Sequence, residues 1–264
     1  MAVIKTEAVI LRMTDFRESS KILTCYTRDY GKMALIAKGA KRLKSRIGGA
    51  LDLLHHLAVV IYRRETREVQ TLSSAEILHA FPGFQEDLDR FSLALAAAEF
   101  LDRVEPKEAP NPRLFRQFLE TLRAMETAES AELLFLQFIW RWLEGAGFKP
   151  KLRRCLRCGQ PPAGKFVYFS VAQGSYLCEK CLRPGEELPK ILRKSVEILL
   201  YLRDSTTKAV AGQRFSADVL QPVAAITWRY LQYHTDISAD LKSLRFLRKL
   251  KFSEKNGSRL YAKT

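Results

Sequence analysis

The chain has 264 residues, of which 47% are hydrophobic and 28% charged, and its 44 Lys and Arg residues exceed its 29 Asp and Glu residues to give a formal net charge of +15. This composition excludes a wholly disordered chain, and the length suits two modest domains or one domain with an insertion. The positive surplus predicts a polyanionic partner: nucleic acid, an anionic membrane surface or an acidic protein.

The hydrophobic pattern argues against membrane and secretory roles. No apolar run approaches the roughly 18 residues that a bilayer-spanning helix needs. The N-terminal residues lack the basic segment followed by a long apolar segment that marks a secretory signal. The five cysteines are odd in number and four form two close pairs, unlike a disulfide scaffold. We therefore expect a cytoplasmic protein with no membrane partner.

The net charge differs in sign between three segments of the chain. Residues 1–80 carry 14 basic and 8 acidic residues, a net of +6; residues 81–150 carry 8 and 12, a net of −4; residues 151–264 carry 22 and 9, a net of +13. An acidic middle between two basic flanks predicts at least three functional regions.

The first region reads as a small β-barrel. Its apolar residues occur in short runs rich in β-branched side chains, separated by turns such as Asp29–Lys32. Strands are expected at Glu7–Met13, Ser20–Thr27, Lys32–Lys38, Leu57–Arg63 and Glu68–Glu76. Five short strands favour a barrel over a sandwich, which usually needs about seven, and the OB-fold is the most common five-stranded barrel.

After Pro82 the hydrophobic period becomes that of a helix. Leu88, Phe91, Leu95, Ala98 and Leu101 fall on one helical face. Asn111 followed by Pro112 has the form of a helix N-cap with proline at the first helical position. Further helices are expected at Leu114–Met125, Ala131–Glu144, Ile191–Arg203, Ala217–Tyr233 and Ser238–Leu250.

Two C-x2-C pairs are the strongest chemical signal. Cys155 and Cys158 form the first pair, Cys178 and Cys181 the second, and 19 residues separate them. Four soft thiolates brought to one centre favour Zn²⁺, and a closed four-thiolate shell predicts one structural zinc ion. The alternatives are a redox motif and four unrelated buried cysteines. A redox C-x-x-C motif occurs as a single pair near a βαβ pattern, which is absent here, and unrelated cysteines rarely have this spacing. Cys25 lies in an apolar strand and is expected in the core.

Together these patterns predict an α+β multi-domain protein. The expected parts are an N-terminal five-stranded OB-fold β-barrel and an all-α domain that carries an inserted zinc module built on the four paired cysteines. The boundaries are 1–80 for the OB-fold, 81–150 for the first helical part, 151–188 for the zinc module, and 189–264 for the second helical part with its basic C-terminus.

A basic loop lies between two of the predicted strands. It places five positive charges within nine residues, Lys38, Lys41, Arg42, Lys44 and Arg46. On an OB-fold such a loop borders the groove that follows a nucleic-acid backbone, and Arg12 and Arg17 add charge nearby. The pattern favours phosphate contact without sequence readout. A solvated hairpin tip that is basic by chance is the alternative.

The C-terminal region supplies a second basic patch. Arg245, Arg248 and Lys249 share one helix face by their spacing. This helix either binds DNA, receives an acidic tail of a partner, or is a plain solvated amphipathic helix.

No catalytic constellation is visible. No serine or carboxylate lies in a G-x-S-x-G, P-loop, G-x-G-x-x-G or H-E-x-x-H setting, so we expect no enzyme. Two rival functions remain open: a nucleic-acid-modifying enzyme with an unrecognised site, and a zinc-ribbon scaffold that binds acidic proteins.

In its order of motifs, the chain resembles the bacterial RecO family of recombination mediators. No single short segment is diagnostic, but the ordered combination is specific and covers essentially the full length. Some members of the family lack the cysteines, whereas this chain keeps all four. The matching segments are Glu7–Arg12, Glu18–Leu23, Tyr30–Gly31, Ala37–Arg42, Lys44–Arg46, Glu76–Leu78, Gly147–Pro150, and the cysteine pairs separated by Phe169, Ser170 and Gly174.

The resemblance implies an OB-fold, a helical domain with an inserted zinc module, and a role in RecF-pathway DNA repair. It implies binding of single- and double-stranded DNA, annealing of complementary strands, and assistance to RecA loading on strands coated with single-strand-binding protein. Its implied partners are RecR and the acidic C-terminal tail of the single-strand-binding protein, with RecA engaged indirectly. It also assigns DNA contact to the basic loop, and it implies a nucleoid-associated protein with no small-molecule substrate.

Overall fold

The computed structural model describes residues 1–235, 237 and 240–246. These residues form two compact units, one made of Met1–Thr127 with the described residues from Asp240 onward, the other of Ala128–Ala239. No helix within the described ranges is long and apolar enough to cross a lipid bilayer.

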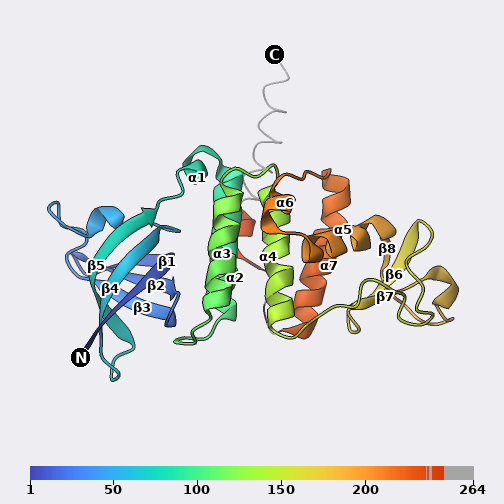
Figure 1. Ribbon diagram of the computed structural model, residues 1–264, viewed down its shortest axis with the longest axis horizontal. Helices are drawn as coiled ribbons and strands as arrows, with labels where there is room; N and C mark the ends of the chain where they lie inside the picture. Colours follow the sequence, from blue (N-terminus) through green and yellow to red (C-terminus); the bar gives the residue numbers. More distant parts are fainter. Residues whose placement is uncertain (236, 238–239, 247–264) are drawn as a thin grey trace, which may run out of the picture. The chain divides into compact units, whose positions relative to one another are not determined.

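The N-terminal part of the first unit is a closed five-stranded barrel (Figure 1). Its strands are β1 (Ala2–Phe16), β2 (Ser20–Thr27), β3 (Gly31–Ala37), β4 (His56–Arg63) and β5 (Val69–His79), joined in the order β1-β2-β3-β5-β4. Alternate apolar side chains of all five strands fill the barrel, among them Ile10, Leu23, Leu35, Ile61 and Leu72. The predicted OB-fold barrel is confirmed, and Cys25 is a buried core residue as expected.

Strand β1 is longer than its apolar run because it serves two partners. Residues Ala2–Val9 pair with β4, and residues Ala8–Phe16 pair with β2 across an irregularity between Ile10 and Arg12. The sharp turn into β3 depends on Gly31, whose φ of +67° lies in the left-handed region. A β-carbon there would also lie 2.3 Å from the carbonyl oxygen of Ala109, so this turn needs glycine.

Three α-helices follow the barrel in the first unit: α1 (Gly83–Glu86), α2 (Leu88–Val104) and α3 (Pro112–Met125). The side chain of Asp87 caps α2 by accepting from the backbone N–H of Arg90, and that of Asn111 caps α3 as predicted. Residues 242–246 are helical, and the carboxylate of Glu99 on α2 accepts from the backbone N–H of Lys242 and Ser243.

The second unit combines helices with a small sheet. Its helices are α4 (Ala131–Gly145), α5 (Arg193–Asp204), α6 (Thr207–Ala211) and α7 (Ala217–His234). Trp140 on α4 is buried, donates to the Thr227 hydroxyl on α7 at 2.8 Å, and stacks on Tyr230. The expectation of a helix beginning at Ile191 is wrong by two residues, because Ile191 and Leu192 end a strand and the helix begins at Arg193.

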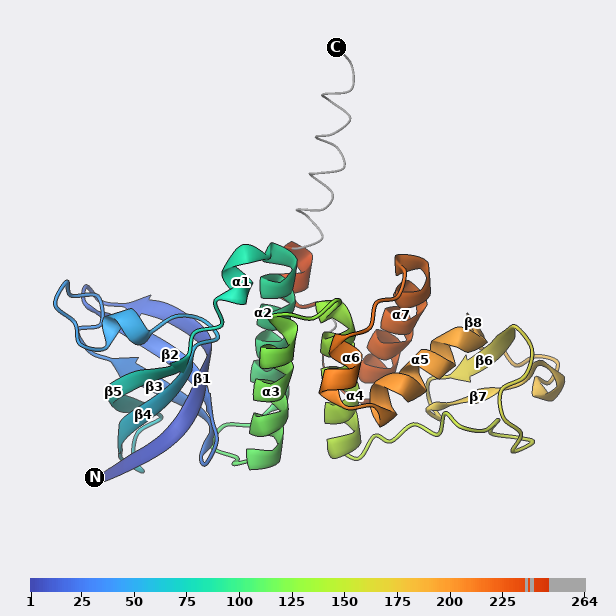
Figure 2. The same ribbon diagram turned by 45° about the horizontal axis from the view of Figure 1, so that its top comes forward.

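An excursion between α4 and α5 carries the four cysteines. It contains β6 (Phe166–Ser170), β7 (Ser175–Leu177), the 3₁₀ turn η2 (Glu179–Cys181) and β8 (Lys190–Leu192). The strands form one antiparallel sheet in the order β7-β6-β8, at the N-terminal end of α5 (Figure 2). Gly174, with a φ of +56°, turns the chain between β6 and β7.

Candidate functional site

The four paired cysteines converge on one point. Their Sγ atoms all lie within 4.8 Å of one another, although the two pairs are far apart in sequence. Cys155 and Cys158 lie on a tight turn closed by a hydrogen bond from the Gly159 N–H to the Cys155 carbonyl. Cys178 and Cys181 lie at η2, where the Cys181 N–H donates to the Cys178 carbonyl.

One sulfur–sulfur distance in the cluster equals the edge of a tetrahedral metal site. The Cys158 and Cys178 Sγ atoms are 3.8 Å apart. A tetrahedron with metal–sulfur bonds of about 2.3 Å has edges of about 3.8 Å, so this separation needs no rearrangement. These four residues could therefore hold a metal ion, and four thiolates leave no open position for chemistry on it.

Hydrogen bonding and burial shift the pKa values of two of the cysteines in opposite directions. Burial opposes ionisation of Cys155, but backbone N–H groups of Cys158, Cys178 and Arg157 donate to its sulfur and lower its pKa to about 6. The hydrogen bond with Cys178, together with burial, raises the pKa of Cys181 to about 12. One thiolate therefore forms readily and opposes ionisation of its neighbours, and a bound dication would remove that opposition.

Arginines around the cysteine turns contact nearby backbone carbonyls and carboxylates. Arg157 donates to the Cys181 carbonyl and pairs with both carboxylate oxygens of Glu186, at 2.6 and 3.1 Å. This pairing lowers the pKa of Glu186 to about 2. Arg154 donates to the Gly159 carbonyl, and Arg153 pairs with Asp204 at 2.7 Å. These side chains join the cysteine turns to their surroundings.

The basic loop occupies the first part of the β3–β4 connection, and its cations differ in their partners. Lys41 is bound at the base of the loop, because its ammonium pairs with Asp15 at 2.8 Å and its backbone N–H donates to the Ser19 carbonyl. The other four cations of the loop are exposed, and none forms an ion pair with another described residue: Lys38, Arg42, Lys44 and Arg46.

The contacts of Lys41 bring the basic loop beside the β1–β2 hairpin, where Arg17 lies. Arg17 is exposed, has a φ of +54°, and holds its guanidinium 5.2 Å from the centre of the Phe16 ring. Arg12 has different partners. Its Nε lies 3.9 Å from the carboxylate of Asp102 on α2, and its Nη2 donates to the Thr24 hydroxyl. Arg17 thus extends the cationic surface of the loop, whereas Arg12 is partly engaged by α2.

Of the second basic patch, the structure describes one member. Arg245 is exposed and pairs with Asp240 at 3.0 Å. Arg248 and Lys249 lie outside the described residues.

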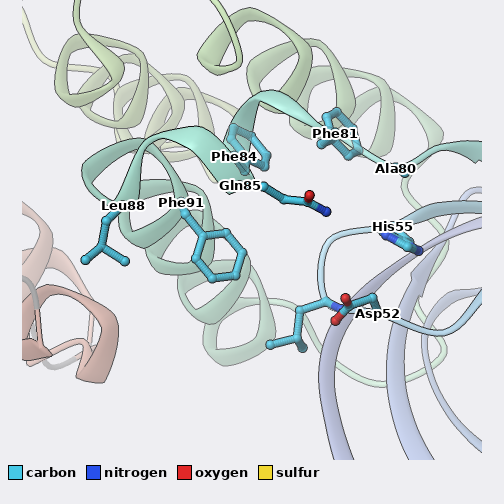
Figure 3. A pocket seen from close by; sticks show the side chains of 9 residues that line it. Asp52, His55, Ala80, Phe81, Phe84, Gln85, Leu88 and Phe91 are labelled. Atoms are coloured by element: carbon cyan, nitrogen blue, oxygen red, sulfur yellow. The ribbon is translucent and has the colours of Figure 1, made fainter.

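A pocket of about 290 Å³ lies within the first unit, between the end of the β3–β4 connection and the start of the helices (Figure 3). Phe81, Phe84 and Phe91 form much of its wall. Its lining includes the carboxylate of Asp52 and no Lys or Arg, so the pocket does not extend the cationic surface of the basic loop. Sequence reasoning did not identify it, because its wall joins residues from the connection and the helices.

Comparison with known proteins gives a consistent result for both parts of the chain. A family model described as Recombination protein O N terminal matches residues 1–81, and one described as Recombination protein O C terminal matches residues 85–245. Three proteins named DNA repair protein RecO are similar to this chain. The one from Halalkalibacterium halodurans is 30% identical, over 93% of this chain and 94% of its own length. The one from Pelotomaculum thermopropionicum is 30% identical over 94% of each chain, and the one from Chlorobium luteolum 31% identical over 80% of this chain and 83% of its own. The chain therefore belongs to the RecO family.

Proposed function

We propose that this chain is a non-enzymatic DNA-repair protein that binds single- and double-stranded DNA and anneals complementary strands. We further propose that it assists RecA loading on strands coated with single-strand-binding protein, together with RecR and through the acidic tail of that coat protein. Its place of action would be the cytoplasm, at the nucleoid. The observation that carries the proposal is the basic loop, with four exposed cations that no described carboxylate neutralises.

Annealing needs no bond to be made or broken by the protein. Cationic surfaces that hold two strands reduce the repulsion between their phosphates and raise their local concentration, and base pairing supplies the driving force. In this account Lys38, Lys41, Arg42, Lys44, Arg46 and Arg17 contact phosphates, with lesser contributions from Arg12 and, at the C-terminal patch, Arg245, Arg248 and Lys249. Contacts of this kind predict strong salt dependence and little sequence preference.

We also propose that the metal at the four cysteines is a single structural Zn²⁺. The support is the all-sulfur donor set, the convergence of its four sulfurs within 4.8 Å, and the 3.8 Å separation of the Cys158 and Cys178 sulfurs, which equals a tetrahedral edge. When bound, the ion would cross-link the two cysteine turns. The surrounding residues then need only hold the turns in place, as Arg157 and Arg154 do.

The proposal is tested by replacing Lys41, Arg42, Lys44 and Arg46 together with Ala. Binding to a single-stranded oligonucleotide should weaken, and the slope of log affinity against log salt should flatten by about 0.7 for each phosphate that the variant no longer neutralises. Unchanged affinity and slope would remove the loop from the DNA site. A protein without salt-dependent DNA affinity would favour the scaffold alternative, and turnover of DNA or RNA would favour the enzyme alternative.

A further inference from the structure

The small sheet beside the cysteines has two different faces. Along β6, Val167 and Phe169 are 0% and 1% exposed and point into the core of the module. Phe166 and Tyr168 alternate with them on the other face, where both are half-buried. The register pairs Tyr168 with Lys190 on β8, so Lys190 lies on the face of the two aromatic rings.

Two lysines are held over this aromatic face. The ammonium groups of Lys190 and Lys165 lie 4.5 and 5.5 Å from the centre of the Phe166 ring. Both lysines are exposed, and neither pairs with a carboxylate among the described residues. Residues 165–178 and 188–196 contain no Asp or Glu. The strands therefore present fixed positive charge without an acidic residue of their own to neutralise it.

Tyr168 remains available for stacking. Phe166 already has a cation over its ring, whereas the side chain of Tyr168 has no ring, cation or hydrogen-bond partner within the described part of the chain. Aromatic rings flanked by cations are the arrangement with which proteins hold single-stranded nucleic acid, because bases stack on the rings while the cations contact phosphates. An acidic peptide or an anionic lipid would use the lysines but would have no base to place on Tyr168.

We propose that the β6–β8 part of this face binds a single DNA strand, with a base stacked on Tyr168 and the adjoining phosphates on Lys165 and Lys190. The inference rests on the proposed DNA-binding function and adds to it a second surface, on the other compact unit from the basic loop. It also assigns to the cysteine module a ligand-binding role beyond stabilising the fold.

The test compares full-length variants on two oligonucleotides of equal length, oligo-dT and an abasic strand. Tyr168→Ala should weaken oligo-dT binding about tenfold, as loss of one stacked base does, and leave the salt slope unchanged. Tyr168→Phe should bind like the parent chain, because it keeps the ring. Tyr168→Ala should bind the abasic strand as the parent does. Lys165→Ala with Lys190→Ala should flatten the salt slope by about 1.4 on both strands.

Tyr233→Ala is the matched control, since Tyr233 is a tyrosine of the same unit with 63% exposure. Its affinity for oligo-dT should equal that of the parent. Metal content and melting temperature report whether each variant is folded, and the two lysine substitutions test the surface even if Tyr168→Ala is unstable. Parent-like oligo-dT binding by Tyr168→Ala, or an equal loss on the abasic strand, would overturn the stacking assignment. If the parent chain itself bound no DNA, the proposed function would fail first.

Discussion

Asp15 restrains one cation of the basic loop, and its removal should tighten DNA binding. The Asp15 carboxylate accepts a hydrogen bond from the Lys41 ammonium at 2.8 Å. That bond holds the pKa of Asp15 below its ordinary value, so the carboxylate is charged throughout the neutral range. While it is paired, Lys41 can neutralise a phosphate only in part. Asp15→Asn keeps the size of the side chain and removes the charge that competes with DNA.

The expected gain in DNA affinity follows from the number of counterions that binding releases from the phosphates. Releasing Lys41 completes at most one phosphate contact, which steepens the salt slope for a single strand by at most about 0.7. Relative to about 1 M salt, a slope change of about 0.7 corresponds to at most about fivefold tighter binding at about 0.1 M salt. Fluorescence anisotropy of a labelled oligo-dT, measured from about 50 to 200 mM salt, gives both the affinity and the slope.

Two further variants separate release of Lys41 from a general change in charge. Glu18→Gln makes the same change of charge on an exposed residue of the β1–β2 hairpin that has no ion pair with another described residue. It should therefore tighten binding less than Asp15→Asn does. In a Lys41→Ala background, Asp15→Asn should lose most of its effect. Equal gains from Asp15→Asn and Glu18→Gln, or a full gain without Lys41, would refute the reasoning.

The remaining predictions concern the metal and pH. Purified protein should contain one zinc ion per chain, measured by elemental analysis. Cys158→Ser should lose the ion and lower the melting temperature of the second unit, whereas Cys25→Ala should retain it. His56 is buried with its Nε2 2.9 Å from Glu7, and burial lowers its pKa despite that carboxylate. A histidine with a lowered pKa stabilises the fold above the ordinary histidine value, so thermal stability of the first unit should fall as pH drops below about 6.5. His56→Gln should weaken this pH dependence in melting curves.

The barrel was predictable because most of its strands have a clear local pattern of alternating apolar residues. Apolar alternation located β2 almost to the residue, and the N-cap at Asn111 located the start of α3. The extent of β1 was not predictable in this way, because Ala2–Glu7 are stabilised by pairing with the distant strand β4. Strand β8 was missed for the same reason: Ile191 continues a helical apolar pattern and becomes a strand only through its pairing with Val167.

The candidate sites also differ in whether a local sequence pattern or long-range strand pairing creates them. Cysteine spacing was enough to predict the cluster, since metal ligands arranged as two close pairs leave a sequence signature. The face formed by Tyr168, Lys165 and Lys190 left no such signature. It depends on which residues of β6 and β8 lie opposite each other, and that register is set by tertiary pairing.

Several carboxylates of the acidic middle of the chain bind other elements of the first unit rather than the basic loop. Asp102 on α2 lies 3.3 Å from Lys32 and 3.9 Å from Arg12, and Glu126 pairs with His79. Glu99 accepts from the backbone N–H groups at the start of the 242–246 helix. These carboxylates are used in contacts between elements of the first unit. In the basic loop, only Lys41 has a described carboxylate partner, so the cations best able to contact phosphates are those that the chain's own acids do not reach.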